Sequence, residues 1–281
     1  MNKPGVAELV RARTLLFVPG DRPDRFDKAA GAGADLIVLD LEDAVAADRK
    51  ERARNHVAEW LTAGGRAVVR ITAAGESGHG DDVSTVAGLQ GLAGILLAKA
   101  ESPEAVAEVA ERTGVPVIPL VESAAGLVRS EAMARERATV RLAFGHLDFA
   151  VDLGAAPDRD AMLHARSTLV LASRVGGLPG PIDGVTTELD RSEAVAADVR
   201  YAYALGMTGK LVIHPSQVKA THAAMQPTQA ELTWATAVIA AYEGGSVARV
   251  DGLMVDPPVL ARAEAVLVRA ARGAVDSTQA G

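Results

Sequence analysis

Residues 36–43 read LIVLDLED, in which four large apolar residues are followed directly by an acidic segment. A continuous apolar run, without strict alternation, is expected when a parallel β-strand is covered on both faces. Similar runs recur along the chain and alternate with longer Ala-rich segments of helical spacing. The expected strands are Thr14–Val18, Leu36–Asp40, Ala67–Ile71, Gly94–Leu97, Val115–Val121, Val140–Phe144, Ile182–Thr186 and Lys210–Ile213. This alternation predicts an α/β fold of the TIM (β/α)8 barrel type.

The fifth expected strand, Val115–Val121, contains two prolines, Pro116 and Pro119. Proline has no N–H group and cannot donate to the ladder of a central strand. Both prolines therefore conflict with the position that a closed barrel requires of this segment.

Two more helices are expected after the eighth strand, over Gln229–Tyr242 and Pro258–Arg272, and an eight-unit barrel does not need them. We therefore predict a catalytic barrel domain over residues 13–225 and a C-terminal helical segment over residues 226–272. The length of 281 residues agrees with this division, because a barrel of this type takes about 250 residues.

Composition excludes several classes of function. The chain has 29 Lys and Arg against 36 Asp and Glu, and no basic cluster offsets this excess of acid, so nucleic acid is not an expected partner. The absence of Cys excludes disulfides, thiolate nucleophiles and Cys-ligated metal centres. Apolar runs are too short to span a membrane, and the first residues lack the apolar run of a signal peptide. We expect a cytoplasmic protein.

Acidic side chains gather at the expected carboxyl ends of the strands, where barrel enzymes place their active sites. Glu42 and Asp43 follow the second strand, Glu122 the fifth and Asp148 the sixth. Carboxylates that crowd one mouth repel each other unless a cation lies among them, and hard cations such as Mg²⁺ take carboxylate and water ligands. We expect Glu122 and Asp148 to hold Mg²⁺. The alternative is that both are helix caps or surface acids.

Two basic residues also lie at strand ends. Arg70 follows a buried apolar run, where a lone guanidinium is costly unless it is paired. It could bind a substrate carboxylate in a bidentate manner or form a salt bridge with Glu42 or Asp43, and the sequence does not rank these. Lys99 follows the fourth strand, and we expect it to form a structural ion pair and not a Schiff base.

Seven segments, in order along the chain, resemble the citrate lyase beta-subunit-like branch of the HpcH/HpaI aldolase family. They are residues 15–20 (LLFVPG), 39–45 (LDLEDAV), 69–71 (VRI), 99–102 (KAES), 120–124 (LVESA), 144–148 (FGHLD) and 213–217 (IHPSQ). Each segment is short, but their combination over about residues 13–270 is specific. Malyl-CoA, citramalyl-CoA and citryl-CoA lyases are neighbours in this group.

The resemblance implies a TIM-like barrel in which Glu122 and Asp148 hold Mg²⁺ at the substrate and Arg70 holds a substrate carboxylate. It also implies a homotrimer or hexamer, in which a C-terminal segment of the adjacent subunit closes the site as a lid and brings a catalytic aspartate. Residues 252–256 (GLMVD) match that motif and make Asp256 the candidate base. Glu42 and Asp43 are candidates for positioning these groups without binding the metal or the substrate themselves.

The implied reaction is Mg²⁺-dependent cleavage of a 3-hydroxyacyl thioester, carried by CoA or acyl carrier protein. The products would be a 2-oxo acid such as oxaloacetate and an acetyl-type thioester, with Asp256 removing the hydroxyl proton and Arg70 fixing the acid. Three alternatives remain open: a thioesterase, a malate-synthase-like condensing enzyme, and a non-catalytic subunit of a citrate lyase-like complex.

Overall fold

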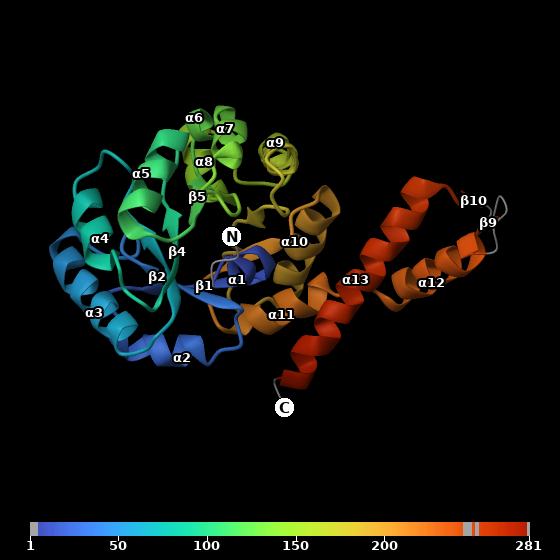
Figure 1. Cartoon of the computed structure of the whole chain (residues 1–281), viewed down its shortest axis with the longest axis horizontal. Coiled ribbons are helices and arrows are strands. Elements are labelled where there is room, and N and C mark those ends of the chain that lie inside the picture. Colours follow the sequence, from blue (N-terminus) through green and yellow to red (C-terminus); the bar gives the residue numbers. More distant parts are fainter. Residues whose placement is uncertain (1–4, 244–248, 251–252, 280–281) are drawn as a thin grey trace. The chain divides into compact units, whose positions relative to one another are not determined.

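The computed structural model describes residues 5–243, 249–250 and 253–279, and its first compact unit, Met1–His222, contains a closed barrel (Figure 1). Eight parallel strands pair in chain order, and β1 closes the barrel on β8, where Leu15 lies opposite Leu211. The strands are β1 Thr14–Pro19, β2 Leu36–Asp40, β3 Ala67–Ile71, β4 Leu92–Leu97, β5 Val117–Val121, β6 Ala143–Phe144, β7 Ile182–Asp183 and β8 Gly209–Val212. The predicted TIM-type barrel is confirmed.

One helix, α1, precedes β1, and the other helices follow strands and surround the barrel (Figure 1). They are α1 Val6–Arg11, η1 Pro23–Arg25, α2 Phe26–Ala30, η2 Ala47–Arg49, α3 Lys50–Thr62, α4 His79–Val86, α5 Pro103–Thr113, α6 Ala124–Val128, α7 Ser130–Arg135, α8 His146–Leu153, α9 Leu163–Val175, α10 Ser192–Leu205 and α11 Ser216–Met225. Local chemistry sets where α5 begins. The Ser102 hydroxyl accepts from the Ala105 N–H at 3.1 Å, and Pro103 occupies the first helical position, where no N–H is needed.

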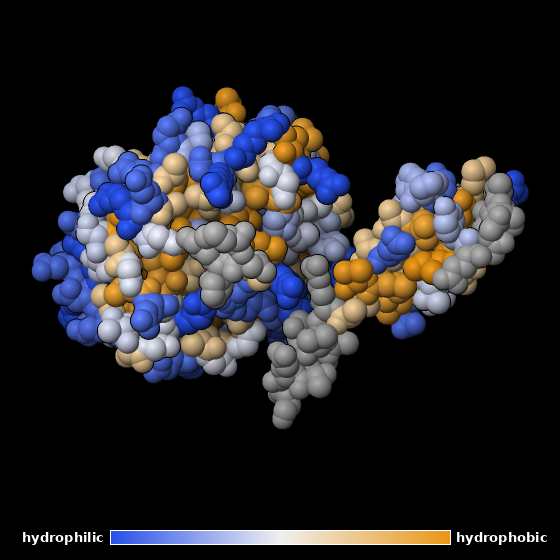
Figure 2. Space-filling model, viewed as in Figure 1, coloured by the Kyte–Doolittle hydropathy of each residue, from blue (hydrophilic) through white to orange (hydrophobic). Residues whose placement is uncertain are grey.

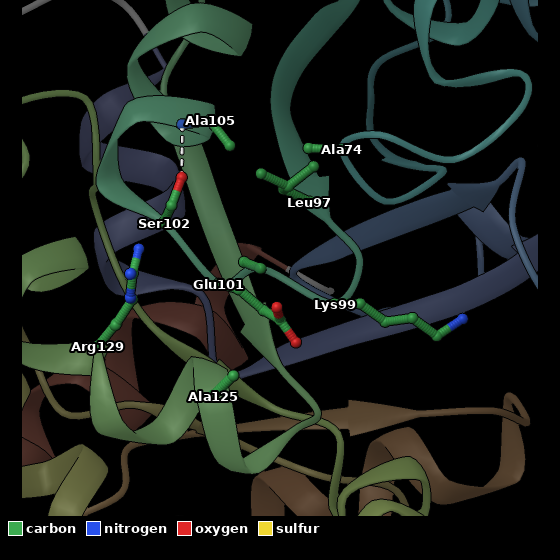
Figure 3. Close-up of a pocket in the computed structure, with 9 residues that line it drawn as sticks. Ala74, Leu97, Lys99, Glu101, Ser102, Ala105, Ala125 and Arg129 are labelled. Atoms are coloured by element: carbon green, nitrogen blue, oxygen red, sulfur yellow. Dashed lines mark hydrogen bonds between the residues drawn. The ribbon is translucent and has the colours of Figure 1, made fainter.

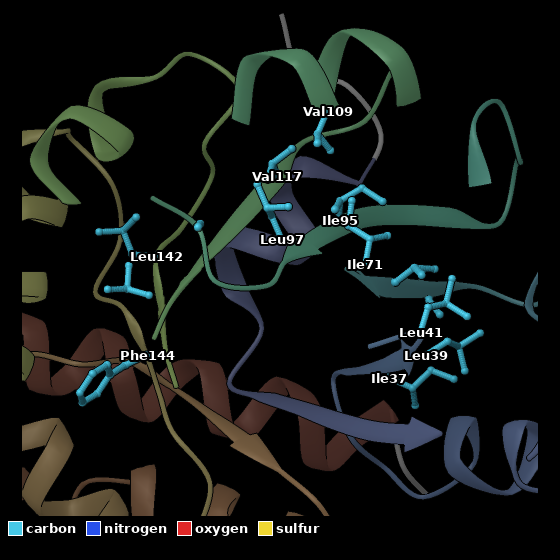
Figure 4. Packing of buried hydrophobic residues seen from close by; sticks show 14 of the residues in the cluster. Ile37, Leu39, Leu41, Ile71, Ile95, Leu97, Val109, Val117, Leu142 and Phe144 are labelled. Atoms are coloured by element: carbon cyan, nitrogen blue, oxygen red, sulfur yellow. The ribbon is translucent and has the colours of Figure 1, made fainter. Parts of the chain in front are cut away.

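Apolar side chains of the strands form an inner and an outer core. Along β2, Ile37 and Leu39 belong to the outer cluster between the barrel and its helices, whereas Leu36 and Val38 belong to the inner one. Figure 4 shows part of the outer cluster, in which side chains of the strands face Val109 of α5. Burial of each such Leu or Ile contributes about 1.5–3 kcal/mol, so two-sided coverage explains the continuous apolar runs.

Pro119 is accommodated because of where the ladder between β5 and β6 begins. β5 starts at Val117, so Pro116 stays outside the strand. The Val117 N–H donates to the Ala138 carbonyl at 3.0 Å, on the β6 side of β5. Backbone groups alternate along a strand, so the Pro119 nitrogen faces the same side. β6 begins only at Ala143, and the missing donor therefore removes no bond from the ladder.

A second compact unit covers Ala223–Gly281. It contains α12 Gln229–Glu243, β9 Arg249–Val250, β10 Leu253–Met254 and α13 Pro257–Gln279. Thr228 and Glu231 form a capping box at the start of α12, in which the Glu231 N–H donates to the Thr228 hydroxyl at 3.2 Å and the Glu231 carboxylate accepts from the Thr228 N–H at 2.8 Å. The core of the unit consists of Ala235, Val238, Val255, Ala263 and Val266. The helices expected after the barrel are thus present.

The surface is polar with scattered apolar patches. On the face of the barrel unit shown in Figure 2, hydrophilic residues form much of the outline. Val128, Val151 and Leu171 are among the exposed apolar residues, and single exposures of this kind are ordinary. Within the part of the chain that the structure describes, no helix combines the length and the apolar character needed to cross a bilayer.

Candidate active site

Arg70 lies near the carboxyl end of β3 and forms a buried network with carboxylates of β2 and the segment after it. Its Nε and Nη2 donate to Oδ1 and Oδ2 of Asp40 at 2.7 and 2.6 Å, and its Nη1 lies 3.0 Å from Oε2 of Glu42. Asp43 is more exposed, and its carboxylate is 4.0 Å from Nη1. Of the two partners that the sequence left open, Glu42 is therefore the close one.

Asp40 is a partner of Arg70 that sequence reasoning missed. The two residues lie directly opposite each other in the register of β2 and β3, and Asp40 is buried. Asp40 also accepts from the N–H groups of Glu42 and Ala44, at 2.8 and 3.2 Å. The signal was an acidic and a basic residue near the ends of consecutive apolar runs, which a barrel places side by side. Asp40 thereby holds both the guanidinium and the loop after β2.

The guanidinium of Arg70 remains charged in this buried position. Burial alone would lower the pKa of Arg70, but Asp40, Glu42 and Glu122 outweigh burial and hold that pKa above its usual range. The ring centroid of Phe17 lies 4.9 Å from Cζ and adds a cation–π contact. Two of the five N–H donors of the guanidinium are hydrogen-bonded to Asp40, and Nη1 forms an ion pair with Glu42. A guanidinium has more donors than Asp40 accepts, and such donors can bind a further carboxylate.

Glu122 follows β5 directly and is a buried carboxyl group. Its Oε2 accepts from the Lys99 N–H at 2.9 Å, and its Oε1 lies so close to Gly145 that a Cβ there would approach it to 2.4 Å. Burial raises the pKa of Glu122 to about 8, the Lys99 N–H and Arg70 lower that pKa, and repulsion from Asp148 and Glu42 adds to the rise. The positive charge around this carboxyl group is therefore not enough to offset burial and the repulsion from the neighbouring carboxylates.

The expected alternative role of Glu122 as a helix cap is filled by its neighbour. The Ser123 hydroxyl accepts from the Gly126 N–H at 3.1 Å and caps α6. Asp148 lies in the first turn of α8 and is partly exposed. Over residues 5–243, 249–250 and 253–279, no hydrogen bond or ion pair to the Asp148 carboxylate is formed. Both carboxylates thus retain oxygen atoms without a protein cation.

This donor set fits a hard divalent cation. A buried carboxyl group with a raised pKa beside a second carboxylate is the environment that a bound cation would relieve. Among the described residues, no three His, Cys, Asp or Glu side chains are arranged to hold a metal. Mg²⁺ needs fewer protein ligands than that, because it commonly takes one or two carboxylates and leaves its other positions to water and substrate.

The raised pKa of Glu122 predicts an unusual pH dependence of stability in Mg²⁺-free buffer. The folded state holds a proton up to about pH 8, whereas the unfolded state releases it near its ordinary value of 4.5. The folded state then binds more protons between these values, so the free energy of unfolding falls as pH rises. The fall is on the order of 5 kcal/mol for this one group, at about 1.4 kcal/mol per pKa unit.

Urea denaturation at pH 5.5 and pH 8.5, each in EDTA, checks this expectation. Glu122→Gln is the matched control, because it removes the titrating group and leaves every other group in place. The slope between the two pH values should be clearly smaller in Glu122→Gln than in the wild type. Equal slopes would show that Glu122 does not titrate with a raised pKa.

Lys99 links the two parts of the site. Its Nζ lies 2.5 Å from Oε1 of Glu42 and 3.8 Å from Oδ1 of Asp43, as the expected ion pair.

A pocket of about 370 Å³ opens beside Lys99 (Figure 3). Its lining also contains Leu97, Ala74, Ala100, Glu101, Ser102, Ala105, Ala125 and Arg129. The lining of this pocket thus combines apolar and polar groups.

The candidate base Asp256 lies in the second compact unit and is exposed. Its Oδ1 accepts from the Val259 N–H at 3.0 Å, so it caps the start of α13. In the motif at residues 252–256, Leu253 and Met254 form β10, whereas Gly252 lies outside the described residues. The catalytic role of Asp256 stays a prediction.

Comparison with known proteins gives the context of this site. Residues 13–215 match the family model described as HpcH/HpaI aldolase/citrate lyase. The chain belongs to this family. The family membership inferred from the seven motifs is thereby confirmed, and the matched residues span all eight strands of the barrel that carries Arg70, Glu122 and Asp148.

Similarity to individual HpcH/HpaI proteins covers nearly the whole chain. A citrate lyase subunit beta-like protein of Mycobacterium tuberculosis is 39% identical over 264 residues, which cover 91% of this chain and 94% of the relative. A (3S)-malyl-CoA thioesterase of Cereibacter sphaeroides is 32% identical and covers 92% of this chain and 94% of its own. The crystal structure of protein CitE from Mycobacterium tuberculosis, in complex with magnesium, acetoacetate and coenzyme A, matches with a TM-score of 0.85 at 37% identity, over 93% of this chain and 98% of that chain.

Proposed function

We propose that this HpcH/HpaI protein is a Mg²⁺-dependent carbon–carbon lyase that cleaves a 3-hydroxyacyl thioester into a 2-oxo acid and an acetyl-type thioester. The observation that carries the proposal is the buried Glu122 carboxyl, with a pKa raised to about 8, beside Asp148 and Arg70 at the barrel mouth. The description of the family as aldolase/citrate lyase supports carbon–carbon cleavage. The magnesium, acetoacetate and coenzyme A bound by the similar protein CitE support a metal, an oxo acid and a thioester carrier.

Each residue has a distinct task in the proposed reaction. Glu122 and Asp148 would hold Mg²⁺, which when bound supplies Lewis-acid stabilisation for the hydroxyl oxygen as it becomes a keto oxygen. Arg70 would bind the carboxylate of the acid through the N–H groups that Asp40 and Glu42 leave free. Asp256, from a neighbouring copy in a homotrimer or hexamer, would take the hydroxyl proton. The carbon–carbon bond would then break and its electron pair would form the thioester enolate, whose carbon would take a proton from water while Asp256 returns its proton to water.

The direct test is an assay of purified protein with citramalyl-, malyl- and citryl-CoA in the presence of Mg²⁺. We expect release of pyruvate, glyoxylate or oxaloacetate together with acetyl-CoA from at least one of them. The same acids carried on acyl carrier protein distinguish the two carriers. If no oxo acid appears with any substrate, under conditions in which a known lyase is active, the proposal is wrong.

Thioester hydrolysis is the second candidate, because the (3S)-malyl-CoA thioesterase of Cereibacter sphaeroides is 32% identical to this chain. Hydrolysis releases free CoA and the intact hydroxy acid, whereas cleavage leaves CoA esterified. A thiol reagent for free CoA, run beside the oxo-acid assay, therefore separates the two. Free CoA without an oxo acid would replace the lyase proposal by the thioesterase.

Asp256→Asn is expected to lower kcat by about 10²–10⁴-fold, the usual contribution of a positioned general base. Asn is also a good helix cap, so α13 should keep the cap that Asp256 now provides and the melting temperature should change little. Mg²⁺ affinity should be unchanged. Steady-state kinetics and thermal unfolding check both statements, and a fully active variant would remove Asp256 from the mechanism.

A further inference from the structure

Lys99 adopts a backbone conformation that side-chain-bearing residues rarely take. Its φ is 45°, and no other non-glycine residue in the described part of the chain has a positive φ. The Cβ atom makes this left-handed region unfavourable, and residues held there are enriched at functional sites. Lys99 comes two residues after the end of β4, at the mouth of the barrel.

The left-handed turn at Lys99 brings the Ala100 N–H to the β5 side of the loop, next to the Lys99 N–H. The Ala98 N–H donates to the Ile71 carbonyl of β3 at 3.3 Å, as in a regular strand. The Lys99 N–H donates to Oε2 of Glu122 at 2.9 Å, and the Ala100 N–H then donates to the Leu120 carbonyl at 3.0 Å. In an extended strand N–H groups alternate between the two neighbours, so the Ala100 N–H would face β3. With the turn, the Ala100 N–H takes the Leu120 carbonyl of β5, and the Lys99 N–H is left to donate to Glu122.

The side chain of Lys99 forms an ion pair on the other side of this turn. Its Nζ lies 2.5 Å from Oε1 of Glu42, whose Oε2 lies 3.0 Å from Nη1 of Arg70. Figure 3 shows the Lys99 side chain extending away from Glu101 and Arg129, so the ammonium points away from these pocket residues. One residue thus connects the Glu122 carboxylate, through its amide, with the buried Arg70 network, through its ammonium.

We infer that Lys99 is a positioning residue whose left-handed backbone orients the Glu122 carboxylate for Mg²⁺. The inference rests on the proposed function, because it takes Glu122 as a metal ligand. With Oε2 occupied by the Lys99 N–H, Oε1 is left on the side of Gly145, three residues before Asp148. Groups that fix a metal ligand in this way typically contribute about 10–100-fold to metal affinity.

The test compares Lys99→Gly with Lys99→Val, two variants that both lack the ammonium. Glycine adopts a positive φ freely, whereas a β-branched residue strongly disfavours it. Isothermal titration with Mg²⁺ should show a dissociation constant about tenfold or more higher in Lys99→Val, and within about threefold of the wild type in Lys99→Gly. Exposed Lys219→Met controls for the loss of one positive charge, and far-ultraviolet circular dichroism checks that each variant is folded.

Each outcome of this comparison either supports or overturns the inference. Equal affinity in Lys99→Val and the wild type overturns the inference, and so does an equally weak Lys99→Gly, since the ammonium alone would then explain the loss. If Lys99→Val does not fold, Lys99→Thr takes its place, because it is also β-branched and disfavours the left-handed turn more than the unbranched Lys does. Failure of the wild type to bind Mg²⁺ overturns the proposed function itself, which separates that result from the other two.

Discussion

Glu122→Gln is expected to lower kcat/KM by about 10³-fold or more while the protein stays folded. The reason is that the loss of charge stabilisation by the metal raises the activation free energy of the reaction by several kcal/mol. Gln keeps an oxygen that can accept from the Lys99 N–H, 2.9 Å from Oε2 in the wild type. It carries no negative charge for Mg²⁺. In Mg²⁺-free buffer at pH 8.5 the variant should be at least as stable as the wild type, since it removes a buried carboxyl whose pKa is raised to about 8.

Lost function with retained or increased stability indicates an active-site residue, and the loss of Mg²⁺ binding identifies a metal ligand. Isothermal titration with Mg²⁺ should show no binding by Glu122→Gln in the millimolar range, and urea denaturation gives the stability. Glu111→Gln, on the exposed surface of α5, is the matched control and should behave as the wild type. Wild-type Mg²⁺ affinity in Glu122→Gln would show that Glu122 does not hold the metal.

Arg70→Met is expected to destabilise the protein by about 3–5 kcal/mol and to abolish turnover, because it leaves the buried Asp40 carboxylate without its cation. Asp40 is 1% exposed and Glu42 is 3% exposed, so solvent cannot replace the guanidinium. Lys99 still pairs with Glu42, but Asp40 loses both side-chain hydrogen bonds. Arg70→Lys should recover part of the stability and little activity, since an ammonium does not reproduce the bidentate geometry.

Urea denaturation measures this effect against an exposed Arg–Glu pair. On α7, Nε of Arg135 lies 3.0 Å from Oε1 of Glu131, and more than half of each side chain is exposed. Arg135→Met should cost less than about 1 kcal/mol, because water screens that pair. If Arg70→Met costs no more than Arg135→Met, the buried network does not support the barrel mouth.

Much of the fold was predictable, because burial on both faces of a parallel strand imposes a purely local pattern. The run at residues 36–40 became β2 with the expected bounds, and residues 67–71 became β3. The strand containing Pro119 conflicted with that local rule. The conflict disappears only when the start of β6 is known, which is a relation between segments and not a property of either one.

The candidate site was predictable in its residue types and less so in its contacts. Glu122 and Asp148 both fall at carboxyl ends of neighbouring strands, and Glu122 experiences the charge of Asp148. The pairing of Arg70 with Asp40 was missed, although both residues were visible, because it depends on the register between β2 and β3. The roles of Glu122, Asp148 and Asp256 stay predictions that the variants above test.

The sequence by itself determined the barrel, its C-terminal helices and the acid at the strand ends, since apolar periodicity and chain order suffice for these. Only the tertiary structure decided the environment of Glu122 and the left-handed turn of Lys99. The physical reason is that a pKa and a strained φ depend on the groups that packing brings together. Glu42, Lys99 and Glu122 belong to three different strand ends, and only the closed barrel places one carboxyl against an amide and another against an ammonium.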